Sequence, residues 1–393
     1  MNYIGPKVYI DLTQLVKNYH LLSDQVGNIP IMATVKANGY GHGAVQVSKA
    51  LEKEGVRYLA VFTIEEGIEL REAGVKSDIY IYSKLNPYSL NKAFEHQLTL
   101  NISSFDDLEI LKAYNSQGNT LKVHLKVDTG MTRLGVAHSQ AEDFLKQAQD
   151  IDYIAIEGLY SHFATADEGD LTYAQSQLDK FNEVLTIAEK LDIKPPLIHC
   201  SNSGAILNLP ESRFNMVRAG MLLYGAFPSD EVPQDLPIKP VMTFTAPVVE
   251  VRDVKAGTHI SYGGVYTTEK DTRIAVVQAG FADGVPRPWY VDGFVKFRDQ
   301  NFKITHIGGI LEFDNDINNC IKKQKTIGAD IRKSFSNLNC LHIEHCNFPS
   351  LYFLCLPFVP NTKPSRSVSF LVSIFFELFI LSPLKSFFVQ LDG

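Results

Sequence analysis

Apolar runs and amphipathic stretches alternate along the first 220 residues of the chain. Short, β-branched apolar runs predict buried strands, and between them apolar residues recur with helical spacing, as at 63–73, 104–114 and 173–191. The predicted strands end near Lys36, Phe62, Ser83, Ile102, Val127, Ser161, Cys200 and Arg218. Helices between apolar strands indicate βαβ units with a parallel sheet. Eight such units predict an α/β fold of the (β/α)8 TIM-barrel type, with a doubly wound sheet as the alternative.

The pattern changes after the eighth unit. Three prolines between residues 228 and 237 are typical of a linker. Beyond them, residues 240–254, 258–266 and 273–278 have the composition of strands and turns, without helical spacing. The sequence therefore predicts a barrel domain at 1–235 and an all-β domain at 236–300.

A second change occurs near residue 300. Residues 301–393 hold only four of the 26 glycines but twelve of the 24 phenylalanines. The apolar run at 368–381 is short for a membrane span, and if exposed it and the run at 350–360 would favour aggregation. This atypical tail is not expected to continue the β domain.

Composition and charge narrow the function classes. A chain of 393 residues with 45% hydrophobic residues and a net charge of −7 is typical of a globular enzyme and gives no reason to expect nucleic acid or a membrane as partner. Residues 1–7 lack the apolar core of a signal peptide, so a cytoplasmic protein is expected. The five cysteines match no zinc spacing, and no metal is expected.

The first candidate chemistry lies at residues 31–43. A buried strand is predicted to end on Lys36, and Gly39, Gly41 and Gly43 follow it with Tyr40 and His42 between them. A lysine is costly to bury without a partner or a role, and glycines allow backbone N–H groups to approach a phosphate. An imine-forming lysine beside an anionic cofactor fits this pattern, and a solvated lysine before a flexible turn is the alternative.

Polar residues recur at the other predicted strand ends. They lie at 126–133, 161–165, 199–203 and 217–220. A single polar residue at a strand end more often has a structural role, such as a hydrogen bond or a salt bridge. Together with Lys36 at one rim of a barrel, these segments would form a pocket with two lysines, two arginines and a histidine, which favours an anionic ligand.

These motifs resemble those of the bacterial alanine racemases, enzymes that use pyridoxal 5'-phosphate (PLP) and combine a barrel with a β domain. The matching segments follow the family's order: 35–43, 126–135, 161–168, 200–203, 217–220, 261–264 and 280–284. The resemblance implies interconversion of L-alanine and D-alanine, which supplies D-alanine for peptidoglycan, by a homodimer with shared active sites.

The resemblance also assigns roles to residues. Lys36 would hold PLP as an imine and act as one base, with Tyr262 of the second subunit as the opposing base. Arg218 would face the pyridine nitrogen, and His162 would lie in the cofactor's hydrogen-bond network. Further implied contacts are Tyr40, Asn202, Ser203, Gly220 and Met221 with the cofactor, all but Asn202 at its phosphate, and Arg133 with the substrate carboxylate. Lys126, carbamylated in some members, would support Arg133.

The chain departs from the family in two places. Phe281 stands where the family usually has tyrosine, at the substrate entrance. After about residue 300, the family's Gly-Arg-x-Cys-Met-Asp motif and a later phosphate-binding tyrosine have no counterpart. A change of reading frame near 300–310 explains this, and a divergent domain is the alternative. An unfinished β domain would leave strands without partners and predicts low solubility and little racemase activity.

Other functions remain to be separated. Arg218 and Tyr262 argue against a decarboxylase of basic amino acids on the same two-domain plan. The segments 261–263 and 280–284 argue against a non-catalytic PLP-binding carrier made of the barrel alone. A racemase of serine or another small amino acid stays open, because no residue here fixes the substrate side chain.

Overall fold

The computed structural model describes residues 5–114, 116–286, 293–297, 300–307 and 387–391. These divide into two compact units, one formed by residues 9–243 and one formed by residues from 244 onward together with the first eight. The apolar runs predicted at 350–360 and 368–381 lie outside the described residues. Residues 308–386, which follow the proposed change of reading frame, also lie outside the described residues.

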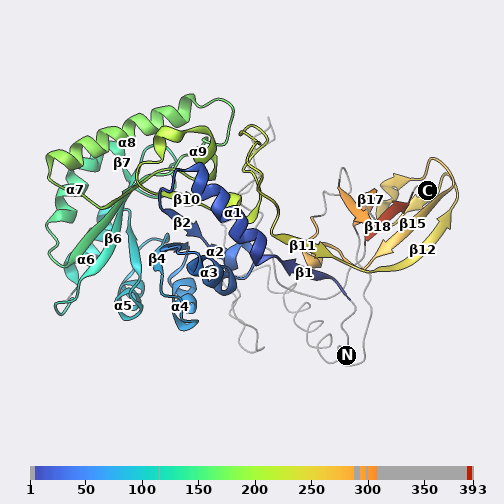
Figure 1. Cartoon of the computed structure of the whole chain (residues 1–393), viewed down its shortest axis with the longest axis horizontal. Helices are drawn as coiled ribbons and strands as arrows, with labels where there is room; N and C mark the ends of the chain where they lie inside the picture. The colour runs from blue at the N-terminus through green and yellow to red at the C-terminus, as the bar shows by residue number, and fades with distance from the viewer. Residues whose placement is uncertain (1–4, 115, 287–292, 298–299, 308–386, 392–393) are drawn as a thin grey trace, which may run out of the picture. The chain divides into compact units, whose positions relative to one another are not determined.

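Eight parallel strands form a barrel in the unit of residues 9–243 (Figure 1). A parallel bridge between His199 and Met216 joins the last strand of the path to the first, so the doubly wound alternative is wrong. In spatial order the strands are β10 (Val217–Ala219), β2 (Ile31–Thr34), β3 (Tyr58–Val61), β4 (Asp78–Ile81), β5 (Thr99–Ile102), β6 (Leu121–Asp128), β8 (Ile154–Tyr160) and β9 (Leu197–His199), with β7 (Val136–Ala137) beside β6.

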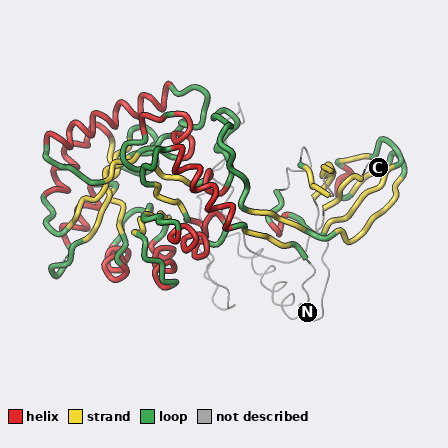
Figure 2. The backbone as a smooth tube through the Cα atoms, in the orientation of Figure 1, coloured by secondary structure: helices red, strands yellow, loops and turns green. Residues whose placement is uncertain are grey.

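Helices cover the outside of this barrel (Figure 2). Several begin where the side chain of an Asp, Thr, Asn or Ser accepts a backbone N–H of the first turn, as Asp11 does for α1 and Thr63 for α4. The helices are α1 (Leu12–Gln25), α3 (Ala44–Lys53), α4 (Ile64–Glu72), α5 (Pro87–His96), α6 (Phe105–Ala113), α7 (Ala141–Gln149), α8 (Thr172–Lys190) and α9 (Ser203–Asn208). Within the described residues, no helix is both long and apolar enough to cross a bilayer.

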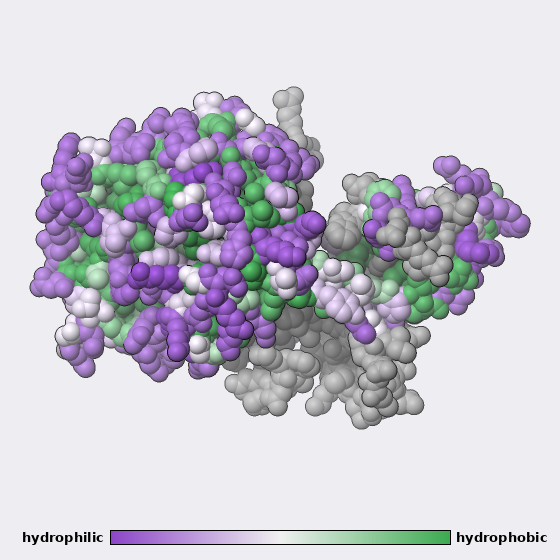
Figure 3. Space-filling model, in the orientation of Figure 1, coloured by the Kyte–Doolittle hydropathy of each residue, from purple (hydrophilic) through white to green (hydrophobic). Residues whose placement is uncertain are grey.

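The barrel has an aliphatic outer core and an aromatic, partly polar interior. Leucine, valine and isoleucine fill the layer between strands and helices, while Figure 3 shows hydrophilic residues over much of the exterior. Inside, Tyr80 and Tyr160 are buried, and both hydroxyls lie near Asn101 Oδ1, at 3.3 and 3.0 Å. Buried polar atoms require such partners.

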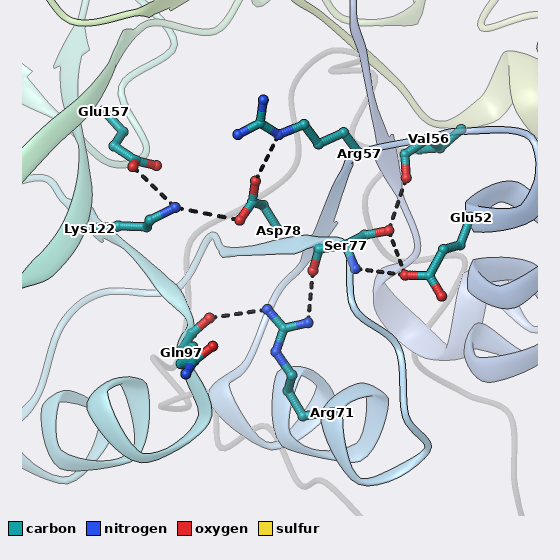
Figure 4. A network of polar contacts seen from close by, with 9 residues as sticks. All are labelled: Glu52, Val56, Arg57, Arg71, Ser77, Asp78, Gln97, Lys122 and Glu157. Carbon is teal, nitrogen blue, oxygen red and sulfur yellow. Dashed lines mark hydrogen bonds and ion pairs between the residues drawn. The ribbon is translucent and has the colours of Figure 1, made fainter.

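A polar network stabilises the amino ends of the strands (Figure 4). Arg71 of α4 donates to the carbonyls of Val75 and Ser77, at 2.8 and 2.7 Å, and to those of His96 and Gln97, at 3.0 and 3.1 Å. The guanidinium is half-buried, and burial lowers its pKa. The guanidinium of Arg71 therefore holds together, by hydrogen bonds, the loops that follow α4 and α5.

We expect Arg71→Met to lower the free energy of unfolding by about 2–4 kcal/mol, because four carbonyls lose a charged donor. Urea unfolding followed by circular dichroism measures this. Arg57→Met is the matched control, since Arg57 pairs with Asp78 at 3.2 Å but is 70% exposed. A surface pair is worth less than about 1 kcal/mol. Equal losses in the two variants would contradict the prediction.

The second unit is built from strands, as the sequence predicts for an all-β domain, and their pairing is antiparallel. Its main sheet runs in the order β12 (Val248–Val254), β15 (Thr272–Val277), β18 (Phe387–Leu391), β17 (Gln300–Ile307) and β16 (Phe294–Phe297). A small sheet in the same unit pairs β13 (His259–Ile260) with β14 (Tyr266–Thr267). Another pairs β1 (Lys7–Ile10) with β11 (Met242–Thr245), and each of these two strands has residues in both units.

Residues 387–391, at the end of the tail, contradict two expectations. β18 lies between β15 and β17 and pairs with both, with Val277 opposite Phe387 and Ile304 opposite Val389. The expectation that residues 301–393 do not continue the β domain is therefore wrong for residues 301–307 and 387–391. The expectation that strands of the β domain lack partners is wrong for β15 and β17. An extended apolar segment satisfies the backbone groups of two strands at once.

Candidate active site

Lys36 opens a left-handed turn. Backbone hydrogen bonds define a short helical element, α2 (Lys36–Tyr40), but Ala37, Asn38, Gly39 and Tyr40 have φ between 51° and 63°. Such angles cost a residue other than glycine about 1–2 kcal/mol. β2 ends at Thr34, so the strand predicted to end on Lys36 is two residues too long. Strain concentrated beside one lysine indicates a functional segment.

Contacts from outside the turn hold it in place. The Ala37 N–H donates to Glu66 Oε1 at 2.5 Å, and the Ala44 N–H donates to Asn38 Oδ1 at 2.9 Å. The Lys36 Nζ lies 5.9 Å from the ring centroids of both Tyr40 and Phe62. The amine of Lys36 therefore lies at the same distance from two aromatic rings.

Tyr40, Ser203 and Gly220 converge beside this turn. The Gly220 N–H donates to Ser203 Oγ at 3.2 Å, and a β-carbon on Gly220 would lie only 3.2 Å from the Tyr40 hydroxyl. Asn202 caps α9 by accepting the Ala205 N–H at 3.0 Å, and so begins the helix that carries Ser203. Burial raises the pKa of Tyr40 and keeps its hydroxyl protonated. Two hydroxyls and a backbone amide are thus gathered where an oxyanion could bind.

Arg218 lies on β10 and is 3% exposed. Its Nη1 donates to His199 Nδ1 at 2.7 Å, and its Nη2 donates to His162 Nδ1 at 2.9 Å. The carbonyl oxygens of Ser161 and Cys200 also lie 2.9 and 3.0 Å from Nη2, whose two N–H groups are therefore shared among three acceptors. These acceptors are all neutral, so the full positive charge of the guanidinium remains at the rim.

Three histidines have fixed tautomers behind Arg218. Arginine only donates, so Nδ1 of His162 and of His199 must accept and their protons lie on Nε2. His199 Nε2 lies 2.9 Å from His124 Nδ1 and donates to it. Burial, reinforced by the charge of Arg218, lowers the pKa of all three, that of His124 to about 3. All three imidazoles are therefore neutral at physiological pH.

The Tyr160 ring contacts His199 and two basic side chains, those of Lys126 and Arg218. Its ring stacks on His199 with centroids 4.7 Å apart. The Lys126 Nζ and the Arg218 Cζ each lie 5.3 Å from the centroid of the Tyr160 ring. Cations over an aromatic face are stabilised by the ring quadrupole.

Lys126 is buried on β6. Burial, and then the charges of Arg133 and Arg218, lower the pKa of its amine to about 7, against a smaller opposing effect of Asp128. A large share of the amine is therefore uncharged, and hence nucleophilic, near neutral pH. Arg133 follows a loop in which the Asp128 carboxylate accepts the N–H groups of Gly130 and Thr132.

Sequence reasoning placed His199 in the polar segment 199–203 without assigning it a role, and it missed His124, Tyr160 and Glu66. A signal existed for His124, because strand side chains alternate and His124 shares a face with Lys126. His199 stands at a predicted strand end beside Cys200, whose thiol is buried with a pKa raised by burial to about 12. Among the residues that the structure describes, no group of His, Cys, Asp and Glu suits a metal ion.

The predicted second base lies in the other unit. Tyr262 opens a short 3-10 turn, η4 (Tyr262–Gly264), and is 74% exposed. Phe281 begins η5 (Phe281–Asp283). Lys36 belongs to the barrel unit, so its meeting with Tyr262 stays a prediction.

Comparison with known proteins identifies the family. Residues 10–228 match the family model for the N-terminal domain of alanine racemase, and residues 241–310 match the model for its C-terminal domain. The chain belongs to the alanine racemase family. The two matches together end at residue 310.

Relatives and solved structures from this family resemble the chain over most of its length. It is 40% identical to the alanine racemase of Halothermothrix orenii over 71% of this chain and 74% of that one. The alanine racemase structure from Clostridium difficile 630 superposes with a TM-score of 0.71 at 34% identity, covering 78% of this chain and 81% of that one. That from Streptomyces lavendulae has a TM-score of 0.71 at 33% identity, covering 78% and 82%.

Proposed function

We propose that the chain is a PLP-dependent racemase that interconverts L-alanine and D-alanine as a homodimer. The observation that carries the proposal is the buried Arg218, whose bonded imidazoles and carbonyls are all neutral acceptors. Arg218 lies on β10, which pairs with β2, the strand that precedes Lys36. The residues fit PLP: an amine for its aldehyde, Tyr40, Ser203 and the Gly220 amide for its phosphate, and Arg218 for its ring nitrogen. When bound, PLP draws electrons from the substrate Cα and makes its proton removable.

Racemisation needs two bases on opposite faces of Cα. In the proposal, Lys36 holds the cofactor covalently and exchanges a proton on one face. Tyr262 of a second copy exchanges a proton on the other face. Removal by one group and return by the other inverts the configuration. One group must start as the base and the other as the acid, and the reverse reaction exchanges these roles and restores the starting protonation of both.

Arg218 would limit the reaction to proton exchange. Arginine does not give up its proton in proteins, so a ring nitrogen facing it accepts a hydrogen bond and stays unprotonated. Negative charge that develops at Cα would then be less delocalised, so Cα would be reprotonated sooner. Side reactions such as transamination are disfavoured.

Lys126 and Arg133 would prepare the substrate side of the pocket. An uncharged Lys126 amine can add carbon dioxide and release a proton to give a carbamate, which would be an anionic partner for Arg133. Arg133 would then be oriented toward the substrate carboxylate. No residue in this set selects the substrate side chain, so alanine itself rests on the family.

The proposal predicts that Lys36 alone carries the cofactor. Borohydride reduction of the PLP-loaded chain, followed by digestion and mass spectrometry, should place the label on Lys36. Proton NMR in deuterated water should show exchange at the Cα of alanine, lowered by about 10³-fold or more in Lys36→Ala. The exposed Lys53 gives the control variant Lys53→Ala.

Three outcomes separate the alternatives. Label on another lysine would overturn the assignment of Lys36. Label on Lys36 without Cα exchange would indicate a non-catalytic PLP-binding protein, the outcome expected if residues beyond 300 are disabling. Faster exchange with serine than with alanine would reassign the substrate.

A further inference from the structure

We propose that Glu66 is a positioning residue for Lys36, because its carboxylate fixes the peptide that follows the lysine. The inference rests on the proposed cofactor role of Lys36. Glu66 lies in the first turn of α4, on the βα unit next to the one that carries the lysine. It is outside every motif that the sequence analysis singled out.

The two carboxylate oxygens of Glu66 bond different segments. Oε1 accepts the Ala37 N–H at 2.5 Å. Oε2 accepts the N–H groups of Phe62 and Thr63, at 2.8 and 3.1 Å. Bonds to an ionised acceptor are shorter and stronger than neutral ones.

Capping of α4 explains only part of this geometry. In a capping box, the glutamate accepts the N–H of the N-cap residue, here Thr63, whose Oγ1 accepts the Glu66 N–H at 3.3 Å. The bonds to Phe62 and Ala37 are additional. The bond to Ala37 reaches across to a separate βα unit, which a helix cap does not require.

The Ala37 N–H stands at the point where the backbone changes hand. Val35 has φ −119°, and Ala37, Asn38 and Tyr40 are left-handed. Within the turn, Gly39 and Gly41 donate to the carbonyls of Val35 and Ala37. The Ala37 amide donates instead to Glu66, so this carboxylate holds the first strained residue after the lysine.

The same carboxylate fixes one wall of the lysine's surroundings. Oε2 holds the backbone of Phe62, whose ring centroid lies 5.9 Å from the Lys36 Nζ. Tyr40, at the end of the left-handed turn, provides the other ring at the same distance. Glu66 therefore connects the lysine's own peptide to a side chain that borders its amine.

The test compares Glu66→Gln with Glu65→Gln. Both remove one negative charge from the first turn of α4, but Glu65 is exposed. A glutamine at 66 has one acceptor oxygen, and its NH2 group would oppose a backbone N–H. In the cofactor-free chain, hydrogen exchange of the Ala37 amide should rise by about 10-fold or more in Glu66→Gln and stay within about 2-fold in Glu65→Gln.

A second measurement follows cofactor capture. Stopped-flow absorbance should show PLP joining Lys36 about 10-fold more slowly in Glu66→Gln than in Glu65→Gln, because the amine is less well positioned. Equal capture rates together with equal Ala37 exchange would overturn the proposal. Faster Ala37 exchange with no PLP capture even by the unchanged chain would support the tether and refute the proposed function.

The unchanged chain provides a test if Glu66→Gln does not fold. The Ala37 amide should then exchange as slowly as that of Phe62, since one carboxylate protects both. Exchange of Ala37 at the rate of an unstructured peptide would overturn the proposal.

Discussion

Replacing Arg218 with methionine should lower the free energy of unfolding by about 3–5 kcal/mol and abolish binding of PLP by Lys36. The guanidinium donates to two imidazole nitrogens and two carbonyls inside the barrel, and each would be left buried without its donor. A buried polar group that loses its partner costs about 1–3 kcal/mol, partly offset here because a buried charge is removed. Urea unfolding measures the loss.

Histidine titration gives a second readout for Arg218→Met. The arginine's charge is the largest cause, after burial, of the lowered pKa values of His162 and His199. Both should therefore titrate at higher pH in the variant, as NMR of the imidazole protons would show. Arg213→Met is the control, because Arg213 bonds the carbonyls of Gln25 and Ile206 and neither histidine. Unchanged stability and unchanged titration in Arg218→Met would contradict the assignment.

Acidification should destabilise the barrel well before its carboxylates are neutralised. His124 has a folded-state pKa of about 3, against 6.5 for the free side chain. The unfolded chain therefore takes up a proton that the folded chain refuses, and stability is full above about pH 6.5 and falls as the pH drops toward 3. For His124 alone the loss reaches up to about 5 kcal/mol. His162 and His199 act in the same direction.

The slope of stability against pH tests this prediction. Urea unfolding between about pH 7 and pH 4 should show net proton uptake on unfolding. His124→Gln should flatten the slope, because it removes an imidazole whose pKa is lowered by burial. Besides His199, the groups near His124 include Asp78 and Glu157 across a small cavity. A stability that is constant down to pH 4 would exclude buried neutral histidines.

The barrel could be predicted from the sequence because its signals are local. Each parallel strand is an apolar run, and the helices between them show their spacing within a dozen residues. The strand ends predicted at Phe62, Ser83, Ile102 and Val127 lie within two residues of the observed ends. Polar residues at those ends then gather at one rim by geometry alone.

The left-handed turn and the histidine chain could not be predicted in the same way. Ala37, Asn38 and Tyr40 have no intrinsic preference strong enough for positive φ, and the turn depends on Glu66, Ala44 and other distant residues. β18 likewise depends on pairing with residues at least 80 positions away in the sequence, which leaves no local pattern. The meeting of Lys36 with Tyr262 requires a second chain and stays a prediction.

The chain of imidazoles behind Arg218 also determines where protons can travel. Every donor in it points away from the rim, from Arg218 to His199 and from His199 to His124. A proton could move inward along this direction only if Arg218 released one, and arginine does not. Because arginine neither releases nor accepts a proton, Arg218 ends this chain of hydrogen bonds for proton transfer in either direction.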